Sequence, residues 1–375
     1  MSMNRREFLA PSTLLAGGPV AEGRGEKTTA TRPGTAQGAA KKFHLVDTEV
    51  HFSFPEHAEA LRRLTTGIYT NWDLSTWGGP ASAHAPFLDV ENGERIKVMD
   101  KAGVDVAVLS VAEPGVQVFN ADVGTNLATL ANDRLAEAIK KHPTRYAGFA
   151  SFAPQDPQKA AKEIERAATK LKLNGILINS HTNGEYLDDK KFWPILEAAQ
   201  ATNMPLYLHP RTVPDYFNPM LDGTPSAMRA AVWGFSAETW LHALRLIFNG
   251  IFEQFPNLTV VLGHMGESIP FWTYRIDYWF HRGPGPASTV YDMKKPSYYF
   301  AKNFFVTTSG MNFHPALKYI YKVLGPDRIM FATDYPYQPE MNEASEFMNS
   351  APMPAADVER MAHGNAEKLF RVPTA

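Results

Sequence analysis

The sequence contains no cysteine among its 375 residues, which excludes disulfide bonds and thiolate metal sites. No apolar run approaches the roughly 18 residues that a helix needs to cross a bilayer, so no contact with a membrane is expected. An excess of one charge is also missing. The 37 basic and 39 acidic residues leave a formal net charge of -2 without a long Lys/Arg block, and nucleic acid is not an expected partner. The remaining candidate metal ligands are His, Asp, Glu and backbone groups.

The first 42 residues differ from the rest of the chain in composition. Arg5 and Arg6 are followed by a Phe-Leu pair, a weakly apolar segment and small residues, in the order typical of a bacterial twin-arginine export signal. The alternative is an unstructured tail that carries two arginines by chance. The predicted location is therefore the periplasm or the cell exterior, and the cytoplasm if this segment is not a signal. We predict three parts: a signal peptide (1–21), a disordered linker (22–42) and one folded domain (43–375).

The domain shows eight short apolar runs that alternate with helical patterns, such as those over 122–142, 160–171 and 237–255. Eight strands, each followed by a helix, are what a (β/α)8 TIM barrel requires. A doubly wound open sheet would need a G-x-G-x-x-G loop after an early strand, and the sequence has none there. The predicted strands are 43–51, 105–111, 146–152, 175–179, 206–209, 258–264, 304–308 and 329–334.

A segment rich in Trp, Gly and Pro follows the first predicted strand. It spans residues 52–89, which is too long for an ordinary connection between a strand and a helix. We interpret it as an insertion after strand one that lies at the mouth of the barrel.

Ionisable side chains stand at the carboxyl ends of four predicted strands. Glu49 and His51 end the first strand, and the period of two places them on one face. His209, His264 and Asp334 end the fifth, sixth and eighth strands. Because the carboxyl ends of barrel strands meet at one rim, these side chains are expected to lie close together.

Each of these residues also has an ordinary structural interpretation. A single histidine at a strand end is more often a hydrogen-bonded structural residue than a ligand, and a Glu-x-His pair alone is weak evidence. Their coincidence at one rim favours a site for one divalent metal, Zn²⁺ or Mn²⁺, because both accept nitrogen and oxygen ligands. His181 follows the fourth strand and is a candidate for facing a substrate, whereas His242 lies within a helix and is interpreted as a packing residue.

Several motifs together resemble the decarboxylase branch of the amidohydrolase superfamily, and within it the γ-resorcylate (2,6-dihydroxybenzoate) decarboxylases. The resemblance runs from Glu49 to about Phe370 and is densest between Pro205 and Asp277. The motifs that carry it are Leu206-Tyr207-Leu208-His209-Pro210-Arg211, Ala243-Leu244-Arg245-Leu246-Ile247, Leu262-Gly263-His264-Met265-Gly266-Glu267, Arg275-Ile276-Asp277, Thr307-Thr308-Ser309-Gly310, Asp327-Arg328-Ile329 and Thr333-Asp334-Tyr335-Pro336.

The resemblance implies roles for particular residues. His264 would take part in proton transfer, with Glu267 as its polar neighbour. Asn179, after the fourth strand, would face the substrate, and Arg211 is a further candidate for contact with the substrate or with a ligand residue. The implied metal ligands are Glu49, His51, His209 and Asp334.

The expected activity is that of a carboxy-lyase, a metal-dependent non-oxidative decarboxylase of a hydroxylated aromatic or related carboxylic acid. Loss of CO₂ from such a ring requires a proton on the ring carbon, and we hypothesise that Asp334 delivers it while His264 sets the protonation of Asp334. The alternative is a mononuclear hydrolase of the same superfamily, such as a lactonase or amidase, with Asp334 as the base. A barrel that serves only as a binding scaffold is a third possibility. The segments 52–89 and 213–232 depart from the resembled decarboxylases and leave the substrate open.

Aromatic residues are divided between the expected mouth and the helices. Helical aromatics such as Trp240, Trp272, Tyr274 and Trp279 are expected in packing or subunit contacts. The resemblance implies a homodimer or a homotetramer. The aromatic residues expected to line a pocket for a planar ring are Trp72, Trp77, Trp233 and Tyr335.

Overall fold

The computed structural model describes residues 43–64, 93–214, 219–280, 282 and 293–374. The predicted signal peptide and linker lie outside the described residues, as does most of the predicted insertion. The described part of that insertion contains helix α1 (Pro55–Leu64), whose His57 and Leu61 are buried. No helix in the described ranges is both long enough and apolar enough to span a membrane.

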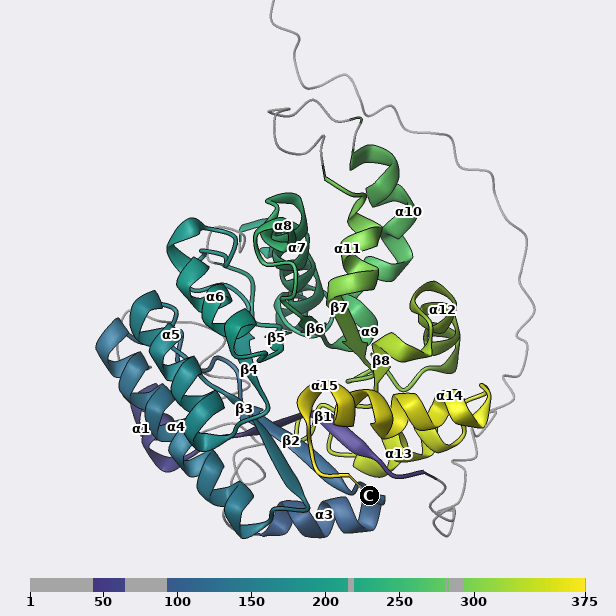
Figure 1. The fold of residues 1–375 in the computed structure, drawn as a ribbon, viewed down its shortest axis with the longest axis horizontal. Helices are drawn as coiled ribbons and strands as arrows, with labels where there is room; N and C mark the ends of the chain where they lie inside the picture. The colour runs from purple at the N-terminus through teal and green to yellow at the C-terminus, as the bar shows by residue number, and fades with distance from the viewer. Residues whose placement is uncertain (1–42, 65–92, 215–218, 281, 283–292, 375) are drawn as a thin grey trace, which may run out of the picture. The chain divides into compact units, whose positions relative to one another are not determined.

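Eight parallel strands form one sheet in chain order, and helices surround it (Figure 1). Each strand pairs with the next, so that Asn179 at the end of β4 lies opposite His209 at the end of β5. The prediction of a (β/α)8 barrel is confirmed. The strands are β1 (Val46–Phe52), β2 (Val106–Val111), β3 (Tyr146–Ala150), β4 (Gly175–Asn179), β5 (Leu206–His209), β6 (Val260–Leu262), β7 (Phe304–Thr307) and β8 (Ile329–Met330).

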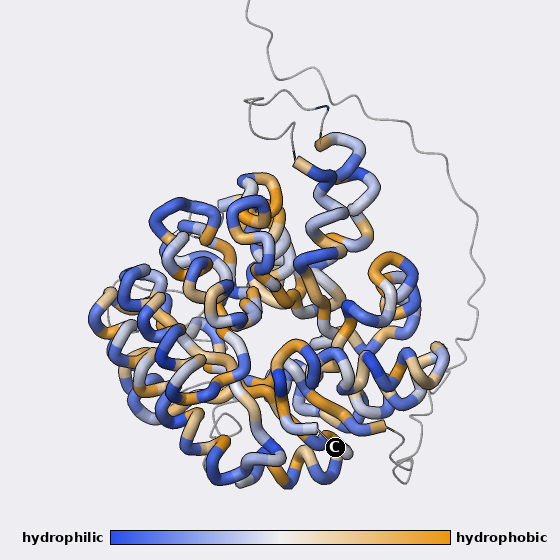
Figure 2. The backbone as a smooth tube through the Cα atoms, in the orientation of Figure 1, coloured by the Kyte–Doolittle hydropathy of each residue, from blue (hydrophilic) through white to orange (hydrophobic). Residues whose placement is uncertain are grey.

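The helices between the strands mix hydrophobic and hydrophilic residues along their length, as the colours in Figure 2 show, which is typical of helices with one buried and one exposed face. The helix predicted over 237–255 is divided into α7 and α8, because Gly250 between them has a φ of 73°. The remaining helices are α3 (Glu94–Ala102), α4 (Ala121–Lys141), α5 (Pro157–Arg166), α6 (Trp193–Ala201), α7 (Gly234–Phe248), α8 (Ile251–Gln254), α9 (His264–Glu267), α10 (Ile269–Phe280), α11 (Pro296–Asn303), α12 (His314–Leu324), α13 (Met341–Asn349), α14 (Ala355–Glu359) and α15 (Asn365–Phe370).

Helix α4 illustrates how the sequence sets these elements. Asn120 caps it by accepting a hydrogen bond from the backbone N–H of Val123 at 2.9 Å. Leu127, Ala131 and Leu135 then recur at helical spacing and are buried in the core between helices and sheet. The helix thereby covers the sheet beside β3 without leaving an apolar face in solvent.

The interior of the barrel is packed with side chains rather than open. Phe149 and Tyr207 point into it from β3 and β5, with ring centroids 5.6 Å apart. Phe370 of α15 closes the amino-terminal end, where its ring lies 4.8 Å from that of Phe149. This filled interior confines any reactive centre to the carboxyl ends of the strands.

Hydrogen bonds between β1 and the segment after β8 complete the barrel. These bonds join the part of β1 that carries Glu49 and His51 to the segment that carries Asp334. The three backbone bonds are Thr48 N to Phe331 O at 3.1 Å, Asp334 N to Glu49 O at 3.1 Å and His51 N to Tyr335 O at 2.8 Å.

Asp47 reinforces this seam from within the barrel wall. Its fully buried carboxyl group bonds with the backbone N–H of Thr333 at 3.0 Å and the hydroxyl of Thr333 at 2.5 Å, and it also accepts from the backbone N–H of Glu49 at 3.2 Å. Burial raises the pKa of Asp47 from 3.8 to about 7, although the hydrogen bonds from Thr333 and Glu49 oppose the rise.

This raised pKa makes stability depend on pH. Between about pH 4 and pH 7 the folded chain holds a proton on Asp47 that the unfolded chain has released, so the free energy of unfolding falls as the pH rises. In Asp47→Asn the side-chain amide does not titrate in this range, while its oxygen still accepts and its NH₂ group still donates hydrogen bonds. Relative to the original chain, we expect the variant to gain stability across this window, by at most about 4 kcal/mol.

Urea unfolding of metal-free protein at a series of pH values measures this difference. Asp122→Asn, at a side chain that is 85% exposed, is the control and should show no such trend. A stability difference for Asp47→Asn that stays constant from pH 4 to pH 7 would show that the carboxyl group does not titrate in this way.

Candidate active site

Four side chains converge at the carboxyl-terminal rim of the barrel. Glu49 and His51 stand on β1, His209 ends β5, and Asp334 follows β8. One potential ligand atom from each lies within 4.8 Å of all the others. Glu49 Oε1 is 3.3 Å from His209 Nε2, and His51 Nε2 is 3.5 Å from Asp334 Oδ1. The structure thus brings together the four residues for which the sequence predicts a shared metal.

Two atoms of this group are left without hydrogen bonds. Glu49 Oε1 and His51 Nε2 are buried and have no hydrogen-bond partner. A buried polar atom without a partner is costly, and a cation bound among these atoms removes that cost for both. Carboxylate oxygens and imidazole nitrogens are ligands that Zn²⁺ and Mn²⁺ both accept. The group therefore fits one divalent metal.

Neighbouring side chains orient the two imidazoles. His209 Nδ1 lies 2.9 Å from Asn179 Oδ1 and 2.8 Å from the Pro210 carbonyl, so Nδ1 carries the hydrogen and Nε2 keeps its lone pair. His51 Nδ1 lies 3.3 Å from Ser110 Oγ. Asn179 holds the side chain of His209, and its expected contact with a substrate stays a prediction.

Glu49 occupies a close-fitting cradle. The hydroxyl of Tyr207 donates to Glu49 Oε2, and the hydroxyl of Thr307 lies 3.4 Å from the same oxygen. A Cβ on Gly263 would come within 2.9 Å of that oxygen, so only glycine leaves it room. Burial raises the pKa of Glu49, but His264 and His209 outweigh burial and hold the pKa well below its ordinary value. Glu49 is therefore an ionised ligand.

His264 lies beside this group on a left-handed turn. All five residues from His264 to Ser268 have positive φ, which is uncommon for residues with side chains and is typical of functional sites. His264 Nε2 is 3.9 Å from Asp334 Oδ2, while Nδ1 is 2.7 Å from Glu267 Oε1. Burial lowers the pKa of His264, but Glu267 and Glu49 outweigh it and raise the pKa well above its ordinary value. The protonated imidazole is thereby favoured.

A cavity of about 190 Å³ adjoins the group. This is below the roughly 300–1,000 Å³ typical of pockets for drug-sized ligands and suits a single substituted ring. His209, His264 and Asp334 all contribute to its wall, so a bound molecule would meet the metal site directly. The other lining residues are Glu113, Pro210, Ala231, Phe235, Ser236, Ser268, Gly310, Met311, Tyr337 and Gln338.

Of the four aromatic residues expected in this cavity, the two that the structure describes, Tyr335 and Trp233, are not among its lining residues. Tyr335 is buried behind the rim, where the Arg95 guanidinium lies 5.4 Å from the ring centroid, and Tyr337 lines the cavity in its place. The reason is the turn at Asp334, whose φ of 69° interrupts the alternation of a strand. Trp233 is 42% exposed and is not among the lining residues, while Trp72 and Trp77 lie outside the described residues.

Arg211 and His181 support the segment after β4 and do not contribute to the described wall of the cavity. Arg211 is buried and donates from Nη1 to the His181 carbonyl at 3.2 Å. His181 Nε2 bonds the Thr212 carbonyl at 2.9 Å, and burial lowers the pKa of His181 to about 2. His242 packs as the sequence predicts, with Nδ1 3.0 Å from Ser180 Oγ.

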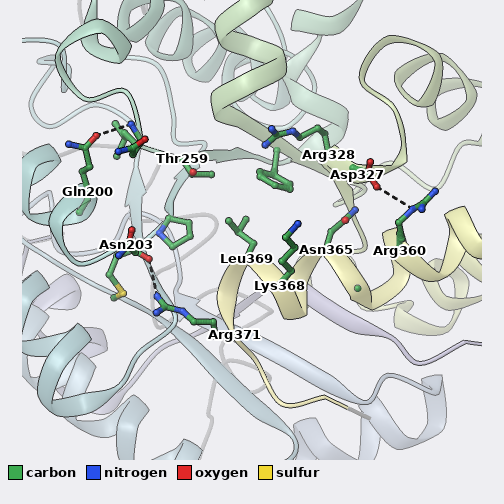
Figure 3. A pocket seen from close by; sticks show the side chains of 17 residues that line it. Gln200, Asn203, Thr259, Asp327, Arg328, Arg360, Asn365, Lys368, Leu369 and Arg371 are labelled. Atoms are coloured by element: carbon green, nitrogen blue, oxygen red, sulfur yellow. Dashed lines mark hydrogen bonds and ion pairs between the residues drawn. The ribbon is translucent and has the colours of Figure 1, made fainter.

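A larger cavity, of about 710 Å³, lies at the opposite end of the barrel (Figure 3). Its wall comes from residues at the amino-terminal ends of β5 to β8 and from α15, including Thr259, Phe305 and Lys368. The metal-binding group identified above does not reach it. Size alone would therefore point to the wrong end of the molecule.

Sequence reasoning missed several residues of the site. Tyr207 could have been found, because it lies two positions before His209 and alternation places both inside the barrel. Ser110 carries no comparable signal, since isolated hydroxyl residues are common in strands, and Thr307, although it belongs to one of the motifs above, has no feature that predicts its contact with Glu49. Glu113 lies just beyond β2, where the pattern of a strand has already ended.

Comparison with known proteins agrees with this geometry. The amidohydrolase family model matches residues 46–372. A γ-resorcylate decarboxylase from Polaromonas sp. (strain JS666) is 36% identical over 296 residues, which cover 76% of this chain and 88% of the relative.

Two solved structures extend the likeness to the fold. The structure of 5-carboxyvanillate decarboxylase from Sphingomonas paucimobilis has a TM-score of 0.82 and 41% identity, covering 88% of this chain and 100% of the other. The second structure is a dihydroxybenzoic acid decarboxylase from Polaromonas sp. JS666 with bound manganese and the inhibitor 2-nitroresorcinol. It has a TM-score of 0.76 and 32% identity, and the match covers 89% of this chain and 98% of the other.

These relatives confirm the predicted resemblance and favour a decarboxylase over the hydrolase alternative. The manganese in one of them agrees with the fit of the four-residue group to one divalent metal. Since the family model spans nearly the whole described domain and the relatives share its barrel, the chain belongs to the amidohydrolase family, in the branch formed by its metal-dependent decarboxylases.

Proposed function

We propose that this chain removes CO₂ from a hydroxylated aromatic carboxylic acid without oxidation. The observation that carries the proposal is the pairing of a single metal-binding group with the hydrogen-bonded His264–Glu267 pair, beside a cavity sized for one ring. The decarboxylase relatives supply the reaction class.

Glu49, His51, His209 and Asp334 would hold the metal. When bound, a divalent cation orients an anionic substrate and neutralises its charge. Asn179 and Ser110 keep the imidazoles in place, and Tyr207 keeps Glu49 in place. The protein thus enters the reaction with its ligands already oriented.

The proton steps belong to Asp334 and His264. Asp334 transfers a proton to the ring carbon that bears the carboxylate. The bond from that carbon to the carboxylate then breaks, CO₂ leaves, and the electron pair restores the aromatic ring. His264 supplies the proton that Asp334 needs, since its Nε2 lies 3.9 Å from Asp334 Oδ2 and Glu267 stabilises its charged form.

Incubating metal-loaded protein with a panel of hydroxybenzoates, and in parallel with lactones, tests the reaction class. We expect CO₂ release from at least one aromatic acid. Asp334→Asn should lower that release about 10²–10⁴-fold, the usual contribution of a positioned acid. Elemental analysis of the variant must still find metal for the comparison to be valid. Normal CO₂ release by metal-bound Asp334→Asn would refute the role of Asp334 as the proton donor. Turnover of lactones without CO₂ release from any aromatic acid would refute the decarboxylase activity.

The support of His209 by Asn179 gives a second prediction. Asn179→Ala removes the side-chain acceptor for His209 Nδ1 and leaves only the Pro210 carbonyl, so metal binding should weaken, by at most about 10- to 100-fold, measured by competition with a chelator. Asn179→Asp keeps an acceptor and should bind metal more tightly than Asn179→Ala. Asn257→Ala, at an exposed residue of the opposite end of the barrel, is the control. Equal affinity in all four proteins would show that Asn179 does not support the ligand.

We also propose that the chain is exported and forms a homodimer or homotetramer. The pair Arg5 and Arg6 supports export. Exposed aromatic residues on α10 support self-association, since Phe271 is 71% and Tyr274 is 81% exposed. Cell fractionation of the chain with both arginines replaced by lysine tests the first proposal, and a monomeric mass in light scattering would refute the second.

A further inference from the structure

The cavity at the amino-terminal end of the barrel is basic. Its described lining residues include four cationic side chains and one acidic side chain, although the whole chain has a formal net charge of -2. The acidic residue is already paired, since Asp327 Oδ1 lies 3.2 Å from Arg360 Nε. The other three cations, Arg328, Lys368 and Arg371, form no ion pair with a described residue. The wall of the cavity therefore carries an excess of positive charge.

Arg328 is the cation of this wall that burial affects most clearly. It is partly buried, and its guanidinium lies 4.6 Å from the ring centroid of Phe305. Burial lowers the pKa of Arg328, and the charge of Asp327 opposes this effect. The guanidinium donates no hydrogen bond to a described residue. A partly desolvated cation without a hydrogen-bonded partner is unfavourable, and an anion bound beside it would reduce that cost.

The last helix supplies the cations on the other side of the cavity. Figure 3 shows Lys368 and Leu369 pointing from α15 into the space that Arg328 borders. Arg371, directly after α15, donates from Nη2 to the Asn203 carbonyl at 3.0 Å and has further N–H groups for a ligand. Basic residues at the end of a helix also interact favourably with its dipole. That effect does not account for Arg328, which lies outside α15.

These cations stand on a fixed frame. Asn365 Nδ2 donates to the carbonyls of Pro326 and Ile329, at 2.7 Å in both cases, and thereby ties α15 to the segment that carries Arg328. Phe370 anchors the same helix in the floor of the barrel. The two sides of the cavity are therefore held together before any ligand arrives, which lowers the entropic cost of binding.

The wall also has an apolar part, which narrows the class of ligand. Leu258, Phe305 and Leu369 contribute it. The volume of about 710 Å³ lies within the roughly 300–1,000 Å³ typical of sites for small molecules. Guanidinium groups bind phosphate and carboxylate groups through paired hydrogen bonds. Charge, volume and apolar surface together fit an organic anion that carries a ring.

We propose that this cavity is a second binding site, for organic anions that carry at least two negative charges beside an apolar ring. The charged groups bind between Arg328, Lys368 and Arg371, and the ring lies against Phe305 and Leu369. The site is at the opposite end of the barrel from the metal group, so the inference does not depend on the proposed decarboxylase activity. A ligand here contacts both the strands and α15, and therefore stabilises the folded domain.

Calorimetric titration of the metal-loaded protein tests the site with two anions, AMP and benzene-1,3-dicarboxylate, which distinguish phosphate from carboxylate ligands. Adenosine is the uncharged control. We expect at least one anion to bind and adenosine not to bind. Arg328→Gln and Lys368→Gln should each weaken that binding at least roughly 10-fold, because each removes a charge-assisted hydrogen bond. Lys162→Gln, at an exposed position of α5, makes the same change of charge elsewhere and should match the wild type.

Asp327→Asn gives the opposite expectation. It removes the one acidic side chain among the described lining residues, so anion binding should become tighter, by roughly 2- to 10-fold. A folding defect cannot produce this gain. The Asp327 side chain is 75% exposed, and thermal unfolding confirms that each variant is folded.

Two results would overturn the inference. One is that neither anion binds to the wild type. The other is that an anion binds with equal affinity to the wild type, Arg328→Gln and Lys368→Gln, which would place it elsewhere, as at the metal group. Weaker binding in both of these variants together with tighter binding in Asp327→Asn would support the site. If Arg328→Gln does not fold, the exposed Lys368 still decides the question through Lys368→Gln.

Discussion

The hydrogen bonds between β1 and the segment after β8 are the contacts on which the site depends. Glu49 and His51 come from the first strand and Asp334 from just after the last, and the backbone N–H of Asp334 donates to the carbonyl of Glu49. An open sheet would leave these ligands apart. Metal binding and closure of the barrel are therefore linked, since a cation held by both sides stabilises the closed form. The buried carboxyl of Asp47 strengthens the same seam without being a ligand.

Around this seam, the site contains buried polar side chains that form hydrogen bonds to the functional side chains. Asn179, Ser110, Tyr207 and Glu267 each hold one functional side chain, and each comes from the barrel wall or from the turn that follows a strand. Within the four-residue ligand group, the buried atoms without a hydrogen-bond partner are Glu49 Oε1 and His51 Nε2, which would bind the metal. Polar networks of this kind fix orientation before a substrate arrives, which lowers the reorganisation that the reaction requires.

The fold and the metal ligands could be predicted because both follow from periodicity. Alternation identified the strands, and the common rim of a barrel then placed Glu49, His51, His209 and Asp334 together. Prediction failed where the backbone leaves the regular pattern. Because Asp334 has a left-handed backbone conformation, Tyr337 and not Tyr335 lines the cavity. Glu113 lies in the turn after β2, where no periodic pattern predicts its position in the cavity wall. The partner of Asn179 depends on register between β4 and β5, which a single sequence does not state.

The last helix has a further consequence for how the chain is made. Phe370 of α15 closes the barrel floor, and Phe331 bonds a residue of β1 that lies 283 positions earlier. A ribosome makes β1 long before these partners, so the growing chain holds Glu49 and His51 without Asp334 until the eighth strand has been made. Contacts between residues so far apart form slowly. The sequence thereby delays its reactive centre until the whole domain is present.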